Sequence, residues 1–306
     1  MIERECLMLN TSPVSSRSLA EWRIGRHMIL LAGVLSAPCA AYAESALGFI
    51  EKLADINSNQ CLIEHAGSEP AHCWILSEVS AGDHIKIAAG GVLTLRLYSG
   101  KSKVLGSPGG TLKADSNTAG PSLLNPLRQL FATLLDRKKE TGTVLAAVRG
   151  DDSRSVTAPL LDADIAALAA GQRGLALRWS GGVAPYALSI AADDPLLDLP
   201  ALATAELPPQ SLDLTPGDYT LTITDAKGTE IERDVEVVAA DEVPGAPEDP
   251  GLAQLPAEYH TLAQAGWLSQ QEDGRWRWEA WLQLQTLPPD FAPGRLLADA
   301  LARGEP

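Results

Sequence analysis

Two cysteines and two histidines lie close together in this 306-residue chain, and they are the residues best suited to chemistry. Cys61, His65, His72 and Cys73 follow the spacing C-x3-H-x6-H-C. Two thiolates and two imidazoles form a ligand set that zinc accepts. The spacing matches no standard zinc finger, and the adjacent His72 and Cys73 fit awkwardly around one tetrahedral ion. In an oxidising compartment, Cys61 and Cys73 most simply form a disulfide. We predict that disulfide, with zinc as the alternative.

Motifs for the common kinds of catalysis are missing from the sequence. It contains no glycine-rich phosphate loop and no HExxH, GxSxG or CxxC sequence. The aspartate pairs Asp151-Asp152, Asp162/Asp164 and Asp193-Asp194 fall at predicted turns or element ends, where aspartate accepts backbone hydrogen bonds. Calcium binding at such a pair is the alternative. We therefore predict no catalytic residue, no metal and no cofactor, and we expect a protein that is not an enzyme.

Tryptophan is concentrated in residues 257–306. Trp267, Trp276, Trp278 and Trp281 fall in two helical patterns that are separated by a Glu-Asp-Gly break. Because tryptophan is enriched at the energetic centres of protein interfaces, these four residues are the candidate partner-binding site. The alternative is that the rings pack this helical tail onto the preceding β domain.

The charge balance excludes two classes of partner. The chain has 24 Lys and Arg against 39 Asp and Glu, a formal net charge of −15. Such an acidic surface repels phosphate backbones and anionic lipid headgroups. We therefore expect no nucleic-acid binding, and we favour a protein partner in the cell envelope.

Residues 1–43 have the pattern of an export signal. Arg23 and Arg26 precede an apolar run at 28–35, and Ala41-Tyr42-Ala43 places small residues where a signal peptidase reads them. We predict cleavage after Ala43, with an overextended gene start before it. No other stretch approaches the roughly 20 apolar residues of a membrane span. The expected location is periplasmic or secreted, without membrane insertion after cleavage.

Residues 44–120 have β patterns. Apolar and polar residues alternate in the run 92–98, as in a half-buried strand. Gly90-Gly91 separates this run from another at 83–88 and predicts a two-residue hairpin turn, because glycine adopts positive φ without steric cost. A third short run, 102–105, follows the Ser99-Gly100 break. Together these runs predict a β-meander.

Four phrases in this region carry a family resemblance. GFIE at 48–51, VSAGDHI at 79–85, AGGVLTL at 89–95 and YSGK at 98–101 resemble the FecR-like periplasmic domain. The resemblance implies a β-rich binding or scaffolding module of the cell envelope. Iron-signalling members of that family also carry a membrane span and a cytoplasmic helix that contacts a sigma factor, and neither is evident in this sequence.

Residues 121–140 change period. Leucines and one phenylalanine recur at three- and four-residue spacing from 123 to 135, which predicts an amphipathic helix. Its apolar stripe fits packing on the protein's own sheet, and docking on a partner is the alternative.

Residues 143–240 form a second β pattern with short, evenly spaced runs. The phrase WSGGVAPY at 179–186 and the phrase PGDYTLTITDAKG at 216–228 resemble bacterial immunoglobulin-like domains, which implies a β-sandwich. We interpret Trp179 as a core residue of that sandwich. The acidic, Pro- and Gly-rich residues 241–256 then predict an extended linker to the helical tail at 257–306.

The expected fold class is mainly β: two β-sandwich or β-roll-like domains, a connecting amphipathic helix and a small C-terminal helical tail. The expected function is an exported, non-catalytic binding or scaffolding protein of the cell envelope. Two alternatives stay open. One is a cell-wall-directed hydrolase or its inhibitor, and the other is a periplasmic sensor that relays a signal through a membrane partner.

Overall fold

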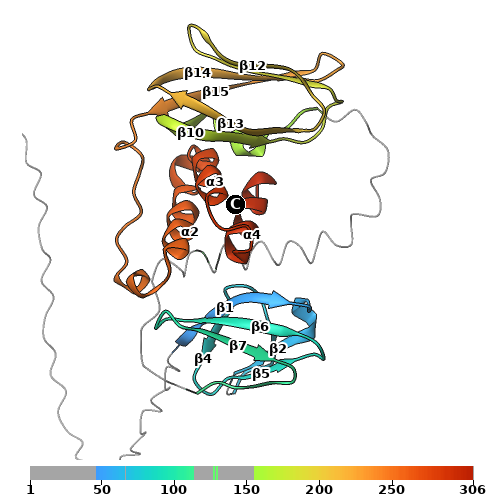
Figure 1. Cartoon of the computed structure of the whole chain (residues 1–306), viewed down its shortest axis with the longest axis vertical. Coiled ribbons are helices and arrows are strands. Elements are labelled where there is room, and N and C mark those ends of the chain that lie inside the picture. Colours follow the sequence, from blue (N-terminus) through green and yellow to red (C-terminus); the bar gives the residue numbers. More distant parts are fainter. Residues whose placement is uncertain (1–45, 66, 114–126, 128, 130–154, 306) are drawn as a thin grey trace, which may run out of the picture. The chain divides into compact units, whose positions relative to one another are not determined.

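The computed structural model describes residues 46–65, 67–113, 127, 129 and 155–305 (Figure 1). The predicted export signal lies outside these residues, as does most of the predicted helix at 121–140. By their contacts, the described residues from 46 onward belong to one compact unit. The fold is mainly β, as predicted, with helices at the C-terminal end of the sequence.

The first part of the described chain is a sandwich of two antiparallel sheets. One sheet has the order β4-β1-β6-β7 and the other the order β3-β2-β5-β8. Aliphatic side chains from both sheets, among them Ile50, Ile63, Ile85 and Leu95, are buried in one shared cluster. The strands are β1 (Ala46–Ala54), β2 (Cys61–Glu64), β3 (Ala71–His72), β4 (Glu78–Ser80), β5 (His84–Ile87), β6 (Val92–Leu97), β7 (Ser102–Gly106) and β8 (Gly109–Thr111).

The predicted meander is wrong in one pairing. β6 and β7 do form a hairpin, but β5 pairs with β2 and β8 and belongs to the opposite sheet. Gly90-Gly91 therefore carries the chain from one layer to the other. A Cβ on Gly91 would lie 2.4 Å from a methyl carbon of Ile56. Gly91 thus serves close packing at the crossing between layers, whereas Gly90 has open space around it and adopts a φ of +83°. The pair does not form a two-residue hairpin turn, because the strands on either side of it belong to different sheets.

The second β region, residues 165–238, has a five-stranded sheet and a two-stranded sheet. The orders are β12-β11-β14-β15-β9 and β10-β13, and only β9 runs parallel to its neighbour, β15. The predicted alternation holds in β14, where Tyr219, Leu221 and Ile223 are buried. Trp179 is 6% exposed and stacks edge-on against Tyr186, as a core residue should. The strands are β9 (Ile165–Ala169), β10 (Gly171–Arg178), β11 (Tyr186–Ala191), β12 (Pro195–Leu202), β13 (Glu206–Leu214), β14 (Gly217–Thr224) and β15 (Glu230–Val238).

Helices complete this second sandwich. Helices α2 (Ala257–Leu268), α3 (Arg277–Gln285) and α4 (Ala292–Ala302) follow the sheets, and α3 contacts β9 and β10 (Figure 1). The buried residues of the helices and of the sandwich belong to one continuous apolar cluster. The predicted helical tail is therefore part of the same core as the sandwich.

A buried ion pair fixes α3 against the strands. Both carboxylate oxygens of Glu279 accept from Arg173, at 2.7 and 3.0 Å, and one of them also accepts from the backbone N–H of Ala169 at 3.1 Å. Glu279 is 3% exposed. Both Nη atoms of Arg173 have partners, whereas its buried Nε has none among the described residues. Because loss of either charged partner would leave the other one buried and unpaired, the pair favours this position of α3 against the strands.

Candidate functional site

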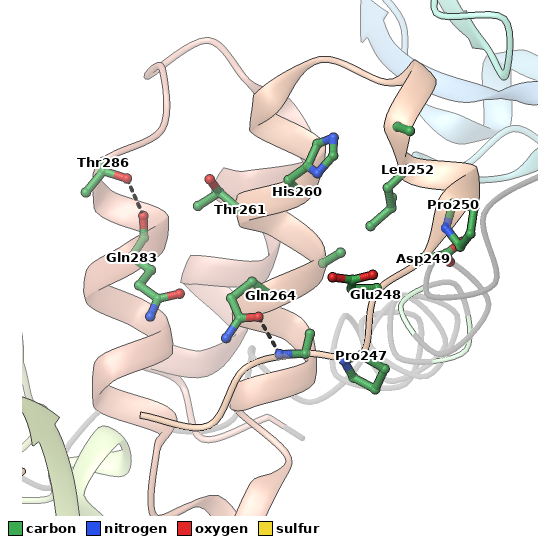
Figure 2. Close-up of a pocket in the computed structure, with 13 residues that line it drawn as sticks. Pro247, Glu248, Asp249, Pro250, Leu252, His260, Thr261, Gln264, Gln283 and Thr286 are labelled. Carbon is green, nitrogen blue, oxygen red and sulfur yellow. Dashed lines mark hydrogen bonds between the residues drawn. The ribbon is translucent and has the colours of Figure 1, made fainter. Parts of the chain in front are cut away.

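The candidate site is an open groove that lies across α2. It has a volume of about 780 Å³ and is bordered by α3 on one side and by residues 246–253 on the other (Figure 2). A volume of this size lies in the range of roughly 300 to 1,000 Å³ that ligand sites occupy. Its lining consists of Ala246, Pro247, Glu248, Asp249, Pro250, Leu252, Ala253, His260, Thr261, Ala263, Gln264, Gln283 and Thr286.

One wall of the groove is an irregular segment, residues 244–250, which we call the strap. The side-chain amide of Gln264 holds it on α2: the backbone N–H of Ala246 donates to Oε1 at 2.7 Å, and Nε2 donates to the carbonyl of Pro244 at 3.0 Å. Prolines at 244, 247 and 250 restrict the backbone of the strap. This part of the predicted linker, residues 241–256, is therefore held against α2.

The strap ends at Pro250, where the chain enters a short 3-10 helix, Pro250–Gln254. The backbone N–H of Gly251 donates to Oδ1 of Asp249 at 2.8 Å, which caps this turn. Leu252 and Leu255 are buried and anchor it in the core. The strap is thus held at both ends, and its middle passes the groove.

Two ionisable side chains in the groove have no hydrogen-bond or ion-pair partner among the described residues. They are Glu248 and His260. Figure 2 shows the carboxylate of Glu248 directed towards α2, between Leu252 and Gln264, and the ring of His260 at the opposite end of the groove from Pro247. Within the part of the chain that the structure describes, neither side chain makes a hydrogen bond or an ion pair. An exposed carboxylate above an apolar floor can accept hydrogen bonds from a ligand without first giving up a partner in the protein.

The four tryptophans that were predicted to bind a partner do not form an exposed surface. Trp276, Trp278 and Trp281 are 3, 1 and 3% exposed, and Trp267 is partly buried against the same core. The indole N–H of Trp278 donates to the carbonyl of Ala176 in β10 at 2.8 Å. The rings pack the helices onto the sandwich, so the alternative interpretation describes their position, and three of the four candidate residues have no surface to offer a partner.

The cysteine and histidine cluster forms the predicted disulfide. Cys61 and Cys73 are bonded, with their Cα atoms 5.3 Å apart, which excludes their thiolates as zinc ligands. His65 contacts the buried carboxylate of Asp83 through Nδ1 at 2.9 Å, whereas His72 is exposed on β3. Among the described residues, no group of three or more His, Cys, Asp or Glu side chains could hold a metal ion. Of the aspartate pairs, 162/164 and 193/194 therefore form no such group, and 151/152 lies outside the described residues.

A second polar cluster lies where α2 meets β1 and β6. The hydroxyl of Tyr259 donates to Oε1 of Glu51 at 2.7 Å, and Nη2 of Arg96 donates to the same oxygen at 2.8 Å. Burial and the bond to Glu51 raise the pKa of Tyr259. Burial opposes the charge on Arg96, but Glu51 outweighs it and raises the pKa of the guanidinium. These three side chains bond to one another, so the cluster links α2 to β1 and β6 and offers no free group to a ligand.

Sequence reasoning missed the groove. The available signal was the run of prolines and acidic residues at 244–250, followed by a helix with polar residues at 260, 261 and 264. Composition alone favoured a linker, because nothing local shows that Gln264 binds backbone 18 and 20 positions earlier.

Comparisons with known proteins leave the family open. No protein-family model and no curated protein matches the chain. A solved structure described as CopC from Methylosinus trichosporium OB3b matches with 22% sequence identity and a TM-score of 0.20, over 25% of this chain and 86% of that chain. Such a partial likeness supports no argument about function. Among the described helices, none is long and apolar enough to cross a membrane.

Proposed function

We propose that this chain is an exported, non-catalytic binding protein of the cell envelope, with the groove across α2 as its binding site and the β1–β8 sandwich as a FecR-like scaffolding module. The observation that carries the proposal is the groove itself: a fixed wall, an apolar floor and an unengaged carboxylate. A concave site with an apolar floor and a few polar groups is where proteins most often bind ligands, which supports the proposal.

Export is supported by two independent features. The sequence of residues 1–43 has the basic, apolar and small-residue segments of a signal peptide. Cys61 and Cys73 form a buried disulfide, which is typical of proteins that fold in an oxidising compartment. The resemblance of residues 48–101 to FecR-like domains agrees with such a location.

The test is site-specific crosslinking in the native compartment. A photoreactive residue replaces exposed Thr286, on the rim of the groove, and the control carries it at exposed Asp198 on β12. We expect the processed protein in the envelope fraction and a crosslink to a defined envelope protein from position 286 only. That protein must then bind the purified chain. Retention in the cytoplasm, or equal crosslinking from both positions, would contradict the proposal.

A further inference from the structure

We infer that the groove takes an extended segment of a basic polypeptide, with a Lys or Arg side chain of that segment paired to Glu248. This inference rests on the proposed function, because it names the chemistry of the ligand for the same groove. Charge, backbone chemistry and the size of the floor lead to it separately.

The charge of the groove is negative. Its lining carries the carboxylates of Glu248 and Asp249, and among the described lining residues only His260 can carry a positive charge. Asp241 and Glu242 precede the strap and are exposed, and the whole chain has a net charge of −15. An acidic surface attracts a cationic segment and repels nucleic acid and anionic lipid.

Glu248 is the carboxylate that is available for pairing. Asp249 already accepts from the backbone N–H of Gly251 and caps the following turn. Glu248 has no partner among the described residues, and it points into the groove (Figure 2). A guanidinium or ammonium group would form a charge-assisted hydrogen bond there, which is about twice as strong as a neutral one.

The backbone of the strap favours an extended ligand. Pro247 and Pro250 have no N–H, so this wall is richer in acceptors than in donors. Within the described residues, the backbone groups of Pro247 and Glu248 form no hydrogen bond. An extended polypeptide alongside the strap would donate its own N–H groups to these carbonyls, as in recognition by added strands.

The floor limits what else the ligand carries. Leu252 and Ala263 are buried, and between them and the polar rim there is room for aliphatic stems or small apolar side chains. Lys and Arg lay such stems along apolar surface while the charged end reaches a carboxylate. The ligand that fits is therefore a chain in which basic residues alternate with small ones.

The test uses the purified full chain without its leader and three labelled synthetic octapeptides. The first alternates Lys or Arg with Val and Ala, the second has Gln at the basic positions, and the third has Glu there. Binding is followed by fluorescence anisotropy at two salt concentrations. The variants are Glu248→Gln, Glu248→Lys and the control Glu232→Gln, which changes an exposed carboxylate on β15. The ring signals of His260, assigned with His260→Gln, locate the bound peptide by NMR.

We expect the basic peptide alone to bind and to shift the His260 signals. Glu248→Gln should weaken binding about 5- to 10-fold, because a charge-assisted bond is replaced by a neutral one. Glu248→Lys should abolish binding, and Glu232→Gln should leave it unchanged. Absence of binding, equal binding of the three peptides, or an unaffected Glu248→Gln variant would each overturn the inference. So would spermidine, added as an unlabelled competitor, if it displaced the labelled basic peptide as effectively as the same peptide without its label. A groove-specific crosslink to an envelope protein combined with binding of the neutral or acidic peptide would refute this inference and leave the proposed function standing.

Discussion

The two β regions close their cores in different ways. In residues 46–111, two four-stranded sheets cover each other, and a disulfide links β2 to the segment after β3. In residues 155–305, a five-stranded sheet faces only two strands, and α3 covers the remaining edge. A small sandwich buries little apolar area and gains from a covalent link. The unequal sandwich instead uses helices and their tryptophans to complete its core. The stability of the first region can therefore be tested by removing its disulfide. The stability of the second can be tested by removing a contact between α3 and the strands.

The largest effect is expected from Glu279→Ala. This change leaves the guanidinium of Arg173 and the N–H of Ala169 without their buried acceptor. Removing one partner of a buried ion pair costs about 3 to 5 kcal/mol of the free energy of unfolding, which urea denaturation measures.

The matched control for Glu279→Ala is Glu206→Ala. Glu206 pairs with Arg178 at 3.7 Å, and both side chains are about half exposed. An exposed pair contributes roughly 0 to 1 kcal/mol. If the two variants were equally stable, α3 would not hold the unequal sandwich closed.

A smaller effect is expected from replacing Cys61 and Cys73 with alanine together. The disulfide closes a loop with a sequence separation of 12, and its loss should lower the free energy of unfolding by about 2 to 4 kcal/mol. Hydrogen exchange should show lost protection in residues 46–111, and residues 155–305 should keep theirs. Equal loss in both regions would mean that they unfold as one cooperative unit.

Local patterns in the sequence were enough to predict single strands. Tyr219, Leu221 and Ile223 alternate with threonines because only one face of β14 is buried, and this alternation is visible in the sequence. The turn at 225–228 and its pairing of β14 with β15 follow from the same local pattern. The pairing of β5 was not predictable, because its neighbours, β2 and β8, lie elsewhere in the sequence.

The groove and the tryptophan contacts depend on distant partners. The helical spacing of Trp276, Trp278 and Trp281 shows that they share a region but not what covers them. The acceptor of the Trp278 N–H lies 102 positions earlier, in β10. The strap has the composition of a linker, and only its contacts with Gln264 make it a wall. The sequence alone therefore could not show that the strap borders the groove.

A third prediction concerns how the predicted helix at 121–140 packs, of which the structure describes Leu127 and Gln129. A Cβ on Gly266 in α2 would lie 2.1 Å from Cδ2 of the buried Leu127. Gly266→Ala should therefore destabilise the fold by about 1 kcal/mol, because overpacking costs about 1 to 3 kcal/mol and the gain in helix propensity returns up to about 1.

The stripe at 121–140 was predicted to pack on the protein's own sheet, with docking on a partner as the alternative, and its described residue Leu127 lies against α2. The sign of the change in the free energy of unfolding on Gly266→Ala distinguishes packing within the protein from docking on a partner. If the leucines of 121–140 docked on a partner and not on α2, Gly266→Ala would stabilise the protein. Thermal unfolding measures the sign. A Leu127→Ala change in the same background should remove the clash, so the two substitutions should be non-additive.

The smallest effect is expected in acid, at Asp225 in the turn between β14 and β15. Burial opposes the ionisation of Asp225, but the backbone N–H groups of Val183, Lys227 and Thr229 outweigh it and lower its pKa. Because the folded pKa lies below the unfolded value of about 3.9, this stabilisation is present above that pH and is lost as the pH falls towards the folded pKa.

The stability difference between the parent protein and Asp225→Asn should therefore shrink in acid, whereas Asp198→Asn, at an exposed position in β12, should follow the parent. Urea denaturation between pH 2 and 7 gives the three curves, and a constant difference for Asp225→Asn would show that its charge contributes nothing to the turn.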